Sequence, residues 1–212
     1  MKMLFKIVII AAFGLLQTLD ASIEIRHATI SDLDKIIALD LDVSMEFFKP
    51  MYENCYHDTT MGQQAEQSLK NEVYCDANIF KNAITAHDNK QKLIIASDTT
   101  TTKYCGLILG EKTNDTTMEI ALLLVAKDYR NQGVGKKLIR TALSAFDGIT
   151  RCQVYPFKQN NKATLAFYEK VGFQKIGDAP ADRKNSYGIS FDKLYFQYVL
   201  DSDGIQTLLR EN

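Results

Sequence analysis

The sequence predicts a single α+β domain built on one mixed β-sheet with helices on its faces. A length of 212 residues is enough for one domain with its own core, and 46% hydrophobic with 24% charged residues is typical of a globular protein. Short apolar runs and amphipathic segments follow each other in the order β, α, α, β, β, β, α, β, α, β, β. Only 3 prolines are present, and no linker between domains is indicated.

Apolar spacing, bounded by turn residues, predicts the elements of the N-terminal half. They are a strand at 23–26, a helix that begins at Ser31, a second helix over 44–56, a helical segment over 62–87, and strands at 92–97 and 104–110 around a Thr-rich hairpin. Ser31 followed by Asp34 is interpreted as a variant capping box for the first helix.

The C-terminal half is predicted in the same way. Its elements are a strand over 118–126, a helix over 134–146, a strand over 151–155, a helix over 161–171, and final strands within 173–176 and 189–200. Gly172 is expected to cap the second of these helices at its C-terminus. The folded domain therefore spans 22–200, and residues 201–212 are expected to form a C-terminal tail.

The first 21 residues differ in composition from the rest of the chain. Lys2 and Lys6 precede a short apolar stretch over 7–16, and small Ala21 stands at its exit, which is typical of a secretory signal peptide. A retained N-terminal membrane anchor and a buried N-terminal helix are the alternatives. We therefore expect an exported or membrane-tethered protein, with a cytoplasmic location as the alternative.

Charge and cysteine content exclude some classes of partner. The formal net charge is −1, and no nucleic-acid-binding surface is indicated. The cysteines form no C-x-x-C pair and the 3 histidines are scattered, so we expect no metal site. In an exported protein Cys55 and Cys75 are candidates for a disulfide, and free thiols are the alternative.

The most informative pattern is a glycine turn between a strand and a helix. The apolar run over 120–126 leads into Arg130-x-x-Gly133-x-Gly135, where the next helix begins. Backbone N–H groups and the helix dipole converge at such a turn, which makes it a site for phosphate. The pattern differs from a dinucleotide-binding turn because Leu138 stands where that turn has its third glycine.

This turn resembles the acyl-CoA pyrophosphate loop of the GNAT acetyltransferase superfamily. A second resemblance is Asn161 placed seven residues before Tyr168, with Gly172-Phe173 shortly after, which looks like the C-terminal signature of the family. The segment that begins at Ile23 also resembles the family's first strand, and the resemblance covers roughly residues 23–200.

The resemblance implies a GNAT fold, with a single mixed central sheet whose central strands splay apart. It implies an N-acetyltransferase that moves an acetyl group from acetyl-CoA to a primary amine by direct transfer in a ternary complex, with no metal. The acceptor would be a small-molecule or protein amine, and the last strand of this fold supports homodimers. A non-catalytic acyl-CoA-binding sensor or scaffold is the alternative.

Two residues are candidates for catalysis. Glu119 matches the family's base and is expected on the same side of its strand as Leu123 and Val125, unless a bulge intervenes. Tyr168 is the candidate acid for the leaving thiolate. A solvated strand-end glutamate and a core tyrosine are the respective alternatives. The candidate donor-binding residues are Leu123, Val125, Arg130, Asn131, Gln132, Gly133, Val134, Gly135, Lys136 and Asn161.

Overall fold

The computed structural model describes residues 22–55, 77–86, 89–156, 158, 162–182 and 195–210, without the side chains of 47–55. These residues form a seven-stranded sheet in the order β1-β2-β3-β4-β5-β7-β6, in which only β4 and β5 are parallel neighbours. The strands are β1 Ile23–His27, β2 Gln91–Asp98, β3 Tyr104–Asn114, β4 Thr117–Val125, β5 Arg151–Val154, β6 Gln174–Asp178 and β7 Phe196–Leu200. The prediction of one mixed sheet is confirmed.

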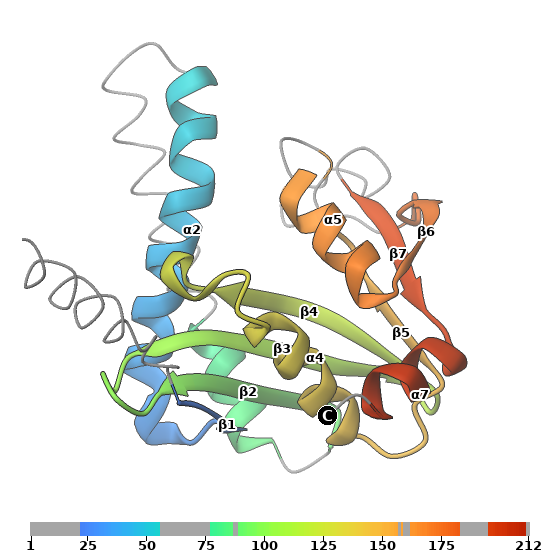
Figure 1. Ribbon diagram of the computed structural model, residues 1–212, viewed down its shortest axis with the longest axis horizontal. Helices are drawn as coiled ribbons and strands as arrows, with labels where there is room; N and C mark the ends of the chain where they lie inside the picture. The colour runs from blue at the N-terminus through green and yellow to red at the C-terminus, as the bar shows by residue number, and fades with distance from the viewer. Residues whose placement is uncertain are drawn as a thin grey trace, which may run out of the picture.

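Helices cover both faces of this sheet (Figure 1). They are the short 3₁₀ helices η1 Ile30–Asp32 and η2 Lys127–Tyr129, and the α-helices α2 Leu33–Cys55, α4 Val134–Ser144, α5 Lys162–Val171 and α7 Ser202–Arg210. Residues 77–85 are helical as well. Gly172, with a φ of 109°, ends α5 in the left-handed conformation that was predicted for this position.

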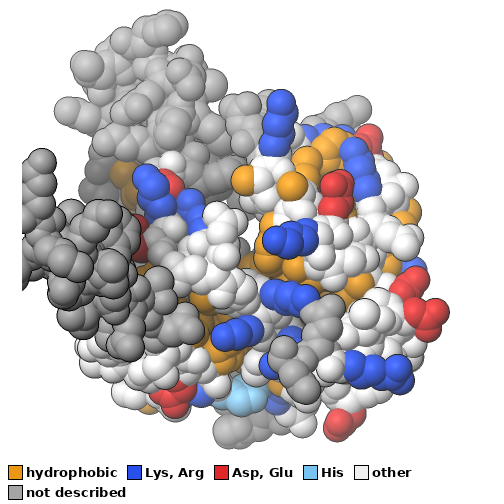
Figure 2. Space-filling view, viewed as in Figure 1, with side chains coloured by type: hydrophobic (Ala, Val, Ile, Leu, Met, Phe, Trp, Pro, Cys, Tyr) orange, Lys and Arg blue, Asp and Glu red, His pale blue; other side chains and the backbone are white. Residues whose placement is uncertain are grey.

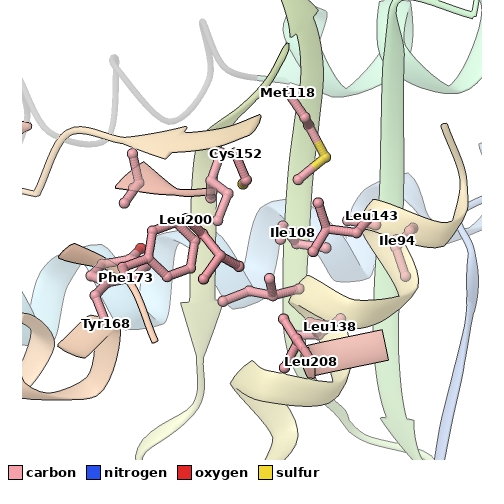
Figure 3. Packing of buried hydrophobic residues seen from close by; sticks show 14 of the residues in the cluster. Ile94, Ile108, Met118, Leu138, Leu143, Cys152, Tyr168, Phe173, Leu200 and Leu208 are labelled. Carbon is pink, nitrogen blue, oxygen red and sulfur yellow. The ribbon is translucent and has the colours of Figure 1, made fainter. Parts of the chain in front are cut away.

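Successive strand residues point to opposite faces, and each face has its own hydrophobic core. On one face the sheet packs against α4, α5 and α7, and Figure 3 shows Ile94, Ile108 and Leu138 in this core. On the other face, Leu93 and Ile95 pack with Ile36 of α2. These two faces are called the donor face, which carries α4, and the α2 face.

The start of the first helix is capped at Thr29, two residues earlier than predicted. The Thr29 backbone N–H and hydroxyl donate to Oδ2 of Asp32 at 2.7 and 2.8 Å. The prediction that Ser31 and Asp34 form the capping box is therefore wrong. The sequence offers overlapping Ser/Thr-x-x-Asp patterns at this point, and the pattern that is used is the one whose aspartate is buried.

Asp32 also joins β1 to the helix. Arg26 donates from Nη1 and Nη2 to its two carboxylate oxygens at 2.7 and 2.9 Å, and the Tyr104 hydroxyl donates to Oδ1. The Arg26 guanidinium, together with these hydrogen bonds, holds the pKa of Asp32 well below its usual range. The charged form of Asp32 therefore stabilises the fold.

We expect Asp32→Asn to lower the free energy of unfolding by about 2 kcal/mol at pH 7, because it breaks an ion pair whose carboxylate is buried and whose guanidinium is partly exposed, and it weakens the cap. A depressed pKa means that this contribution is present above about pH 4 and is lost as the pH falls further. Denaturant unfolding measured from pH 7 to 3 checks both points. Asp34→Asn on the same helix is exposed and serves as the control; an equal loss in both variants would contradict this assignment.

The two helices predicted before and after Ser44 are a single helix. α2 runs without a break from Leu33 to Cys55, through both Ser44 and Pro50. The Ser44 hydroxyl donates to Oδ1 of Asp40 at 3.1 Å, one turn earlier, so this serine does not cap a new helix. The buried apolar residues Ile36, Leu39 and Val43 extend up to the expected boundary at Ser44.

The expected C-terminal tail contains a helix. α7 is amphipathic, and its buried residues Ile205 and Leu208 pack on the donor-face core. Asp201 caps it by accepting from the Gly204 N–H at 3.0 Å. Its apolar residues are spaced as in a helix, and the prediction missed it because it is short and follows the last strand directly.

Several predictions lie outside the described residues. These are the N-terminal segment over 1–21, most of the helical segment over 62–87, the cysteine at position 75 and Asn161. No helix within the described ranges is long and apolar enough to cross a membrane. Cys105 and Cys152 are buried free thiols, and burial raises the pKa of Cys105 to about 11.

Candidate active site

The site is formed where β4 and β5 part. The two strands pair from Thr117 opposite Arg151 to Ile120 opposite Val154. β4 then continues to Val125 while still paired with β3 on its other side, and no described residue pairs with it on the β5 side. Figure 1 shows the two strands diverging at this point. The predicted splay is confirmed, and it gives β4 an open edge over residues 121–125.

Backbone polar groups line this open edge. The Ala126 N–H donates to Cys105 O of β3 at 2.9 Å, so it faces away from the edge. Backbone groups alternate in direction along a strand, and those of Leu123 and Val125 therefore face the open edge. The Val125 carbonyl already accepts from Nε of Arg130 at 3.0 Å. The edge thus offers both groups of Leu123 and the N–H of Val125 to a ligand.

A β-bulge separates Glu119 from the residues of the open edge. The register between β3 and β4 shifts by one residue at Ala121. Glu119 consequently points to the α2 face, whereas Leu123 and Val125 pack on the donor-face core. The expectation that all three share one side of the strand is wrong, because the extra residue of the bulge reverses the alternation.

Glu119 is not a solvated strand end. Only 5% of its surface is exposed, and Nε2 of Gln153 on β5 donates to its Oε2 at 3.2 Å. Glu111 lies opposite it on β3 and accepts a hydrogen bond from Gln91 on β2. A row of polar side chains therefore crosses strands β2 to β5 on the α2 face. Glu119 is the member of this row on β4, and it lies one residue before the point where β4 and β5 stop pairing.

Tyr168 lies on the donor face. It is buried, and its ring makes edge contacts with Phe167 and Phe173 at centroid distances of 5.3 and 5.4 Å. Burial, with a smaller contribution from Cys152 on β5, raises the pKa of the phenol, which therefore stays protonated. Figure 3 shows Tyr168 beside Phe173 in this core. Glu119 and Tyr168 thus lie on opposite faces of the sheet.

The glycine turn forms the N-terminus of α4. Gly133 precedes the helix with φ 79° and ψ −1°, a left-handed conformation, and Asn131 has a φ of 62°. The Lys137 N–H donates to Gly133 O at 3.0 Å. The N–H groups of residues 134–136 lie in the first turn of the helix, before this bond. A helix N-terminus that follows a glycine turn is the kind of position at which phosphate binds in proteins, and phosphate binding here stays a prediction.

Gly135 has a role that the sequence did not indicate. A Cβ atom at this position would lie 3.0 Å from Cζ of Phe167 and 3.6 Å from Cγ2 of Val125. The missing side chain therefore leaves room for a phenyl ring from α5. Phe167 is a residue of this site that sequence reasoning missed, and the signal was its position directly before Tyr168.

Arg130 does not supply free positive charge at the turn. Its Nη1 and Nη2 donate to Oε1 and Oε2 of Glu46 on α2 at 3.0 and 2.7 Å. This pairing lowers the pKa of Glu46. Glu46 therefore compensates the charge of Arg130, which the sequence analysis gave as a candidate donor-binding residue. Figure 2 shows other Lys and Arg side chains on the face that carries α4 and α5.

The hairpin between β2 and β3 is hydrogen-bonded to η2. The Tyr129 hydroxyl donates to Oδ2 of Asp98 at 2.8 Å, and the Thr100 N–H donates to Oδ1 at 2.8 Å. Hydrogen bonds from Thr101 and Tyr129 lower the pKa of Asp98 to about 2. The segment before the glycine turn is therefore held on two sides, by Asp98 and by Glu46.

We expect Arg130→Met to lower the free energy of unfolding by about 1 kcal/mol, because it removes two hydrogen bonds of a partly exposed ion pair with Glu46 and one to the Val125 carbonyl. Thermal unfolding of the single variants and of the double variant with Glu46→Gln measures the coupling between the two side chains. Lys137→Met, on the exposed side of α4, is the control. Additive losses in the double variant would contradict the pairing.

Comparison with known proteins agrees with this geometry. The family model described as "Acetyltransferase (GNAT) domain" matches residues 89–175. N-alpha-acetyltransferase 30 of Schizosaccharomyces pombe is 27% identical over 94 residues, which are 44% of this chain and 53% of that protein. The chain thus matches about half the length of this curated relative.

Solved structures share the fold. A GNAT-family acetyltransferase from Staphylococcus aureus is similar with a TM-score of 0.60 and 18% identity, over 85% of this chain and 99% of the other. The PaiA N-acetyltransferase from Thermoplasma acidophilum, solved in complex with coenzyme A, is similar with a TM-score of 0.54 and 20% identity, over 85% and 99%. The chain therefore shares the fold of these structures, and its residues 89–175 match the GNAT acetyltransferase domain model.

Proposed function

We propose that the protein is an N-acetyltransferase that moves an acetyl group from acetyl-CoA to a primary amine by direct transfer in a ternary complex. The observation that carries this proposal is the open edge of β4, which begins at the splay and ends close to the glycine turn. One elongated ligand with a phosphate at one end and hydrogen-bonding amides along its arm fits both features.

The donor is proposed to bind along this path. Backbone N–H groups from Gln132 to Lys136 would hold the pyrophosphate, with Gly133 supplying the turn conformation. The pantetheine amides would pair with Leu123 and Val125 as an added strand does. Arg130 would act by holding the turn rather than by contact with phosphate. Contact between Asn161 and the donor stays a prediction.

The chemistry requires a neutral amine, a stabilised oxyanion and a protonated leaving group. An amine of pKa about 10.4 is neutral in only about one molecule in a few thousand at pH 7. We propose that Glu119 accepts its proton through water as nitrogen attacks the acetyl carbon. The Val125 N–H would stabilise the oxyanion, and Tyr168 would give its proton to the thiolate as the carbon–sulfur bond breaks.

The placement of the two candidates on opposite faces supports direct transfer. A donor held on the donor face would present its thioester where β4 and β5 part, next to Tyr168. An amine that arrives from the α2 face would meet Glu119 first. The similar S. pombe protein is named an N-alpha-acetyltransferase, which supports an amine acceptor on a protein or a small molecule.

The test is an assay of free thiol released from acetyl-CoA in the presence of peptide amino termini, lysine side chains and polyamines. We expect turnover with at least one amine class and acetylation of that amine by mass spectrometry. Binding of acetyl-CoA without transfer to any of them would favour the non-catalytic module.

Glu119→Gln is expected to slow turnover about tenfold at pH 7, because water must then take the proton without help. The deficit should shrink towards pH 10, where a larger fraction of the amine is already neutral. Rates measured against pH check this; a deficit that is constant with pH would remove Glu119 as the base.

We further propose that residues 1–21 direct export or membrane association, on the basis of their charge and hydropathy pattern. Fractionation of cells that express the full chain tests this. Recovery in the cytosol with these residues intact would contradict it.

A further inference from the structure

Gln153 lies beside Glu119 where the gap between β4 and β5 begins. The two residues are direct partners in the parallel pairing of these strands, and only Ile120 and Val154 pair beyond them before the strands part. Nε2 of Gln153 donates to Oε2 of Glu119 at 3.2 Å on the α2 face. Gln153 is partly exposed, whereas Glu119 is buried. An amide at the edge of the gap is therefore bonded to the buried carboxylate next to it.

Glu111 restricts the position of Glu119 from the other side. It is the partner of Glu119 in the antiparallel pairing of β3 with β4, and Nε2 of Gln91 on β2 donates to its Oε1. Each carboxylate thus accepts a hydrogen bond from the strand that lies away from the other carboxylate. Like charges placed directly opposite each other on neighbouring strands repel. Repulsion from Glu111 and attraction to Gln153 therefore both favour a Glu119 carboxylate on the β5 side, where the gap begins.

The geometry points to Gln153 as a positioning residue that aims the Glu119 carboxylate at the gap. This inference rests on the proposed function, in which Glu119 accepts the proton of the amine. A glutamate side chain has several rotatable bonds, and the hydrogen bond to Gln153 selects among their rotamers. Proton transfer needs short, aligned hydrogen bonds, and a small displacement of the base lowers the rate. A side-chain amide does not titrate near neutral pH, so Gln153 contributes only through Glu119.

The amide donor is the feature to remove. Gln153→Met keeps the length of the side chain and has no donor. We expect it to lower kcat about fivefold at pH 7, less than Glu119→Gln does, because the base is misplaced rather than lost. The deficit should shrink towards pH 10, where a larger fraction of the amine is already neutral. Kd for acetyl-CoA should stay unchanged, because Gln153 is on the face opposite the donor face.

Gln91→Met is the matched control. Gln91 has the same side chain on the same face of the sheet, is also partly exposed, and makes its hydrogen bond to Glu111 instead of Glu119. We expect this variant to leave kcat unchanged. Thermal unfolding of both variants shows that each is folded before its rate is measured, and it compares the stability that each amide contributes.

A double variant separates positioning from a structural role. Once Glu119→Gln has removed the base, the addition of Gln153→Met should cause no further fall in kcat, because there is no base left to position. A structural role of Gln153 would instead lower kcat by the same factor in both backgrounds.

The test is a set of steady-state rates for the wild type and these variants, measured against pH with an amine that the wild type acetylates. A loss for Gln153→Met that fades towards pH 10 and is absent in the Glu119→Gln background supports the positioning role. Unchanged kcat for Gln153→Met, equal losses in both backgrounds, an equal loss for Gln91→Met or a full rate for Glu119→Gln would overturn it while acetyl transfer itself stands. A wild type that transfers acetyl to no amine would overturn the proposed function, and this inference with it.

Discussion

Gly133→Val is expected to raise Kd for acetyl-CoA about a hundredfold, equivalent to about 2.7 kcal/mol. Gly133 has a φ of 79°, and a β-branched residue is strained in this left-handed region. Relief of that strain would turn the N–H groups at the start of α4 away from a common point. Because hydrogen bonds to a charged group contribute about 1.5–3 kcal/mol each, the loss of one or two accounts for the effect. Calorimetric titration of each variant measures it.

The control for this substitution is Gly177→Val in β6. A Cβ at either position would meet nothing within 4 Å, and only Gly133 has the left-handed φ. The pair therefore separates backbone conformation from steric contact. If Gly133→Val binds acetyl-CoA as tightly as Gly177→Val does, the glycine turn is not the pyrophosphate site.

Tyr168→Phe is expected to lower kcat about a hundredfold and to leave Kd for acetyl-CoA nearly unchanged. The substitution removes only a hydroxyl, and the edge contacts of the ring with Phe167 and Phe173 remain. The raised pKa of the phenol means that Tyr168 carries its proton before the reaction begins. Steady-state rates together with titration of the donor separate turnover from binding.

Tyr198→Phe is the matched control, since Tyr198 is a buried tyrosine in the same core whose hydroxyl donates to Glu169 at 3.0 Å. We expect it to cost some stability and to leave kcat unchanged. A similar fall in kcat for both variants, or no fall for Tyr168→Phe, would mean that Tyr168 has only a structural role.

The parts of this site that follow from local chemistry were predictable. The positive φ of Gly133 and Gly172 and the strand–turn–helix at α4 are each specified by a few neighbouring residues. The parallel order of β4 and β5 follows from the helix between them. The splay of β4 and β5 was predicted only from the resemblance to a known family, because no local sequence pattern encodes it.

The predictions of this site that failed concern features set by contacts between residues far apart in the sequence. The bulge at Ala121 reverses the side of Glu119, and it is set by the pairing of β4 with β3. Arg130 is paired by Glu46, which lies 84 residues earlier in the chain. The ring over Gly135 comes from α5. Sequence periodicity cannot report such pairs, because each residue alone has an ordinary surface or core explanation.

The most direct test of the account is calorimetric titration of acetyl-CoA into the purified protein. Saturable binding with a micromolar Kd, about −8 kcal/mol, is the result that the open edge of β4 and the glycine turn predict. The nucleotide half of the donor should bind more weakly at the same site. A well-folded protein that takes up no acetyl-CoA would contradict the central claim that this fold holds an acyl-CoA donor.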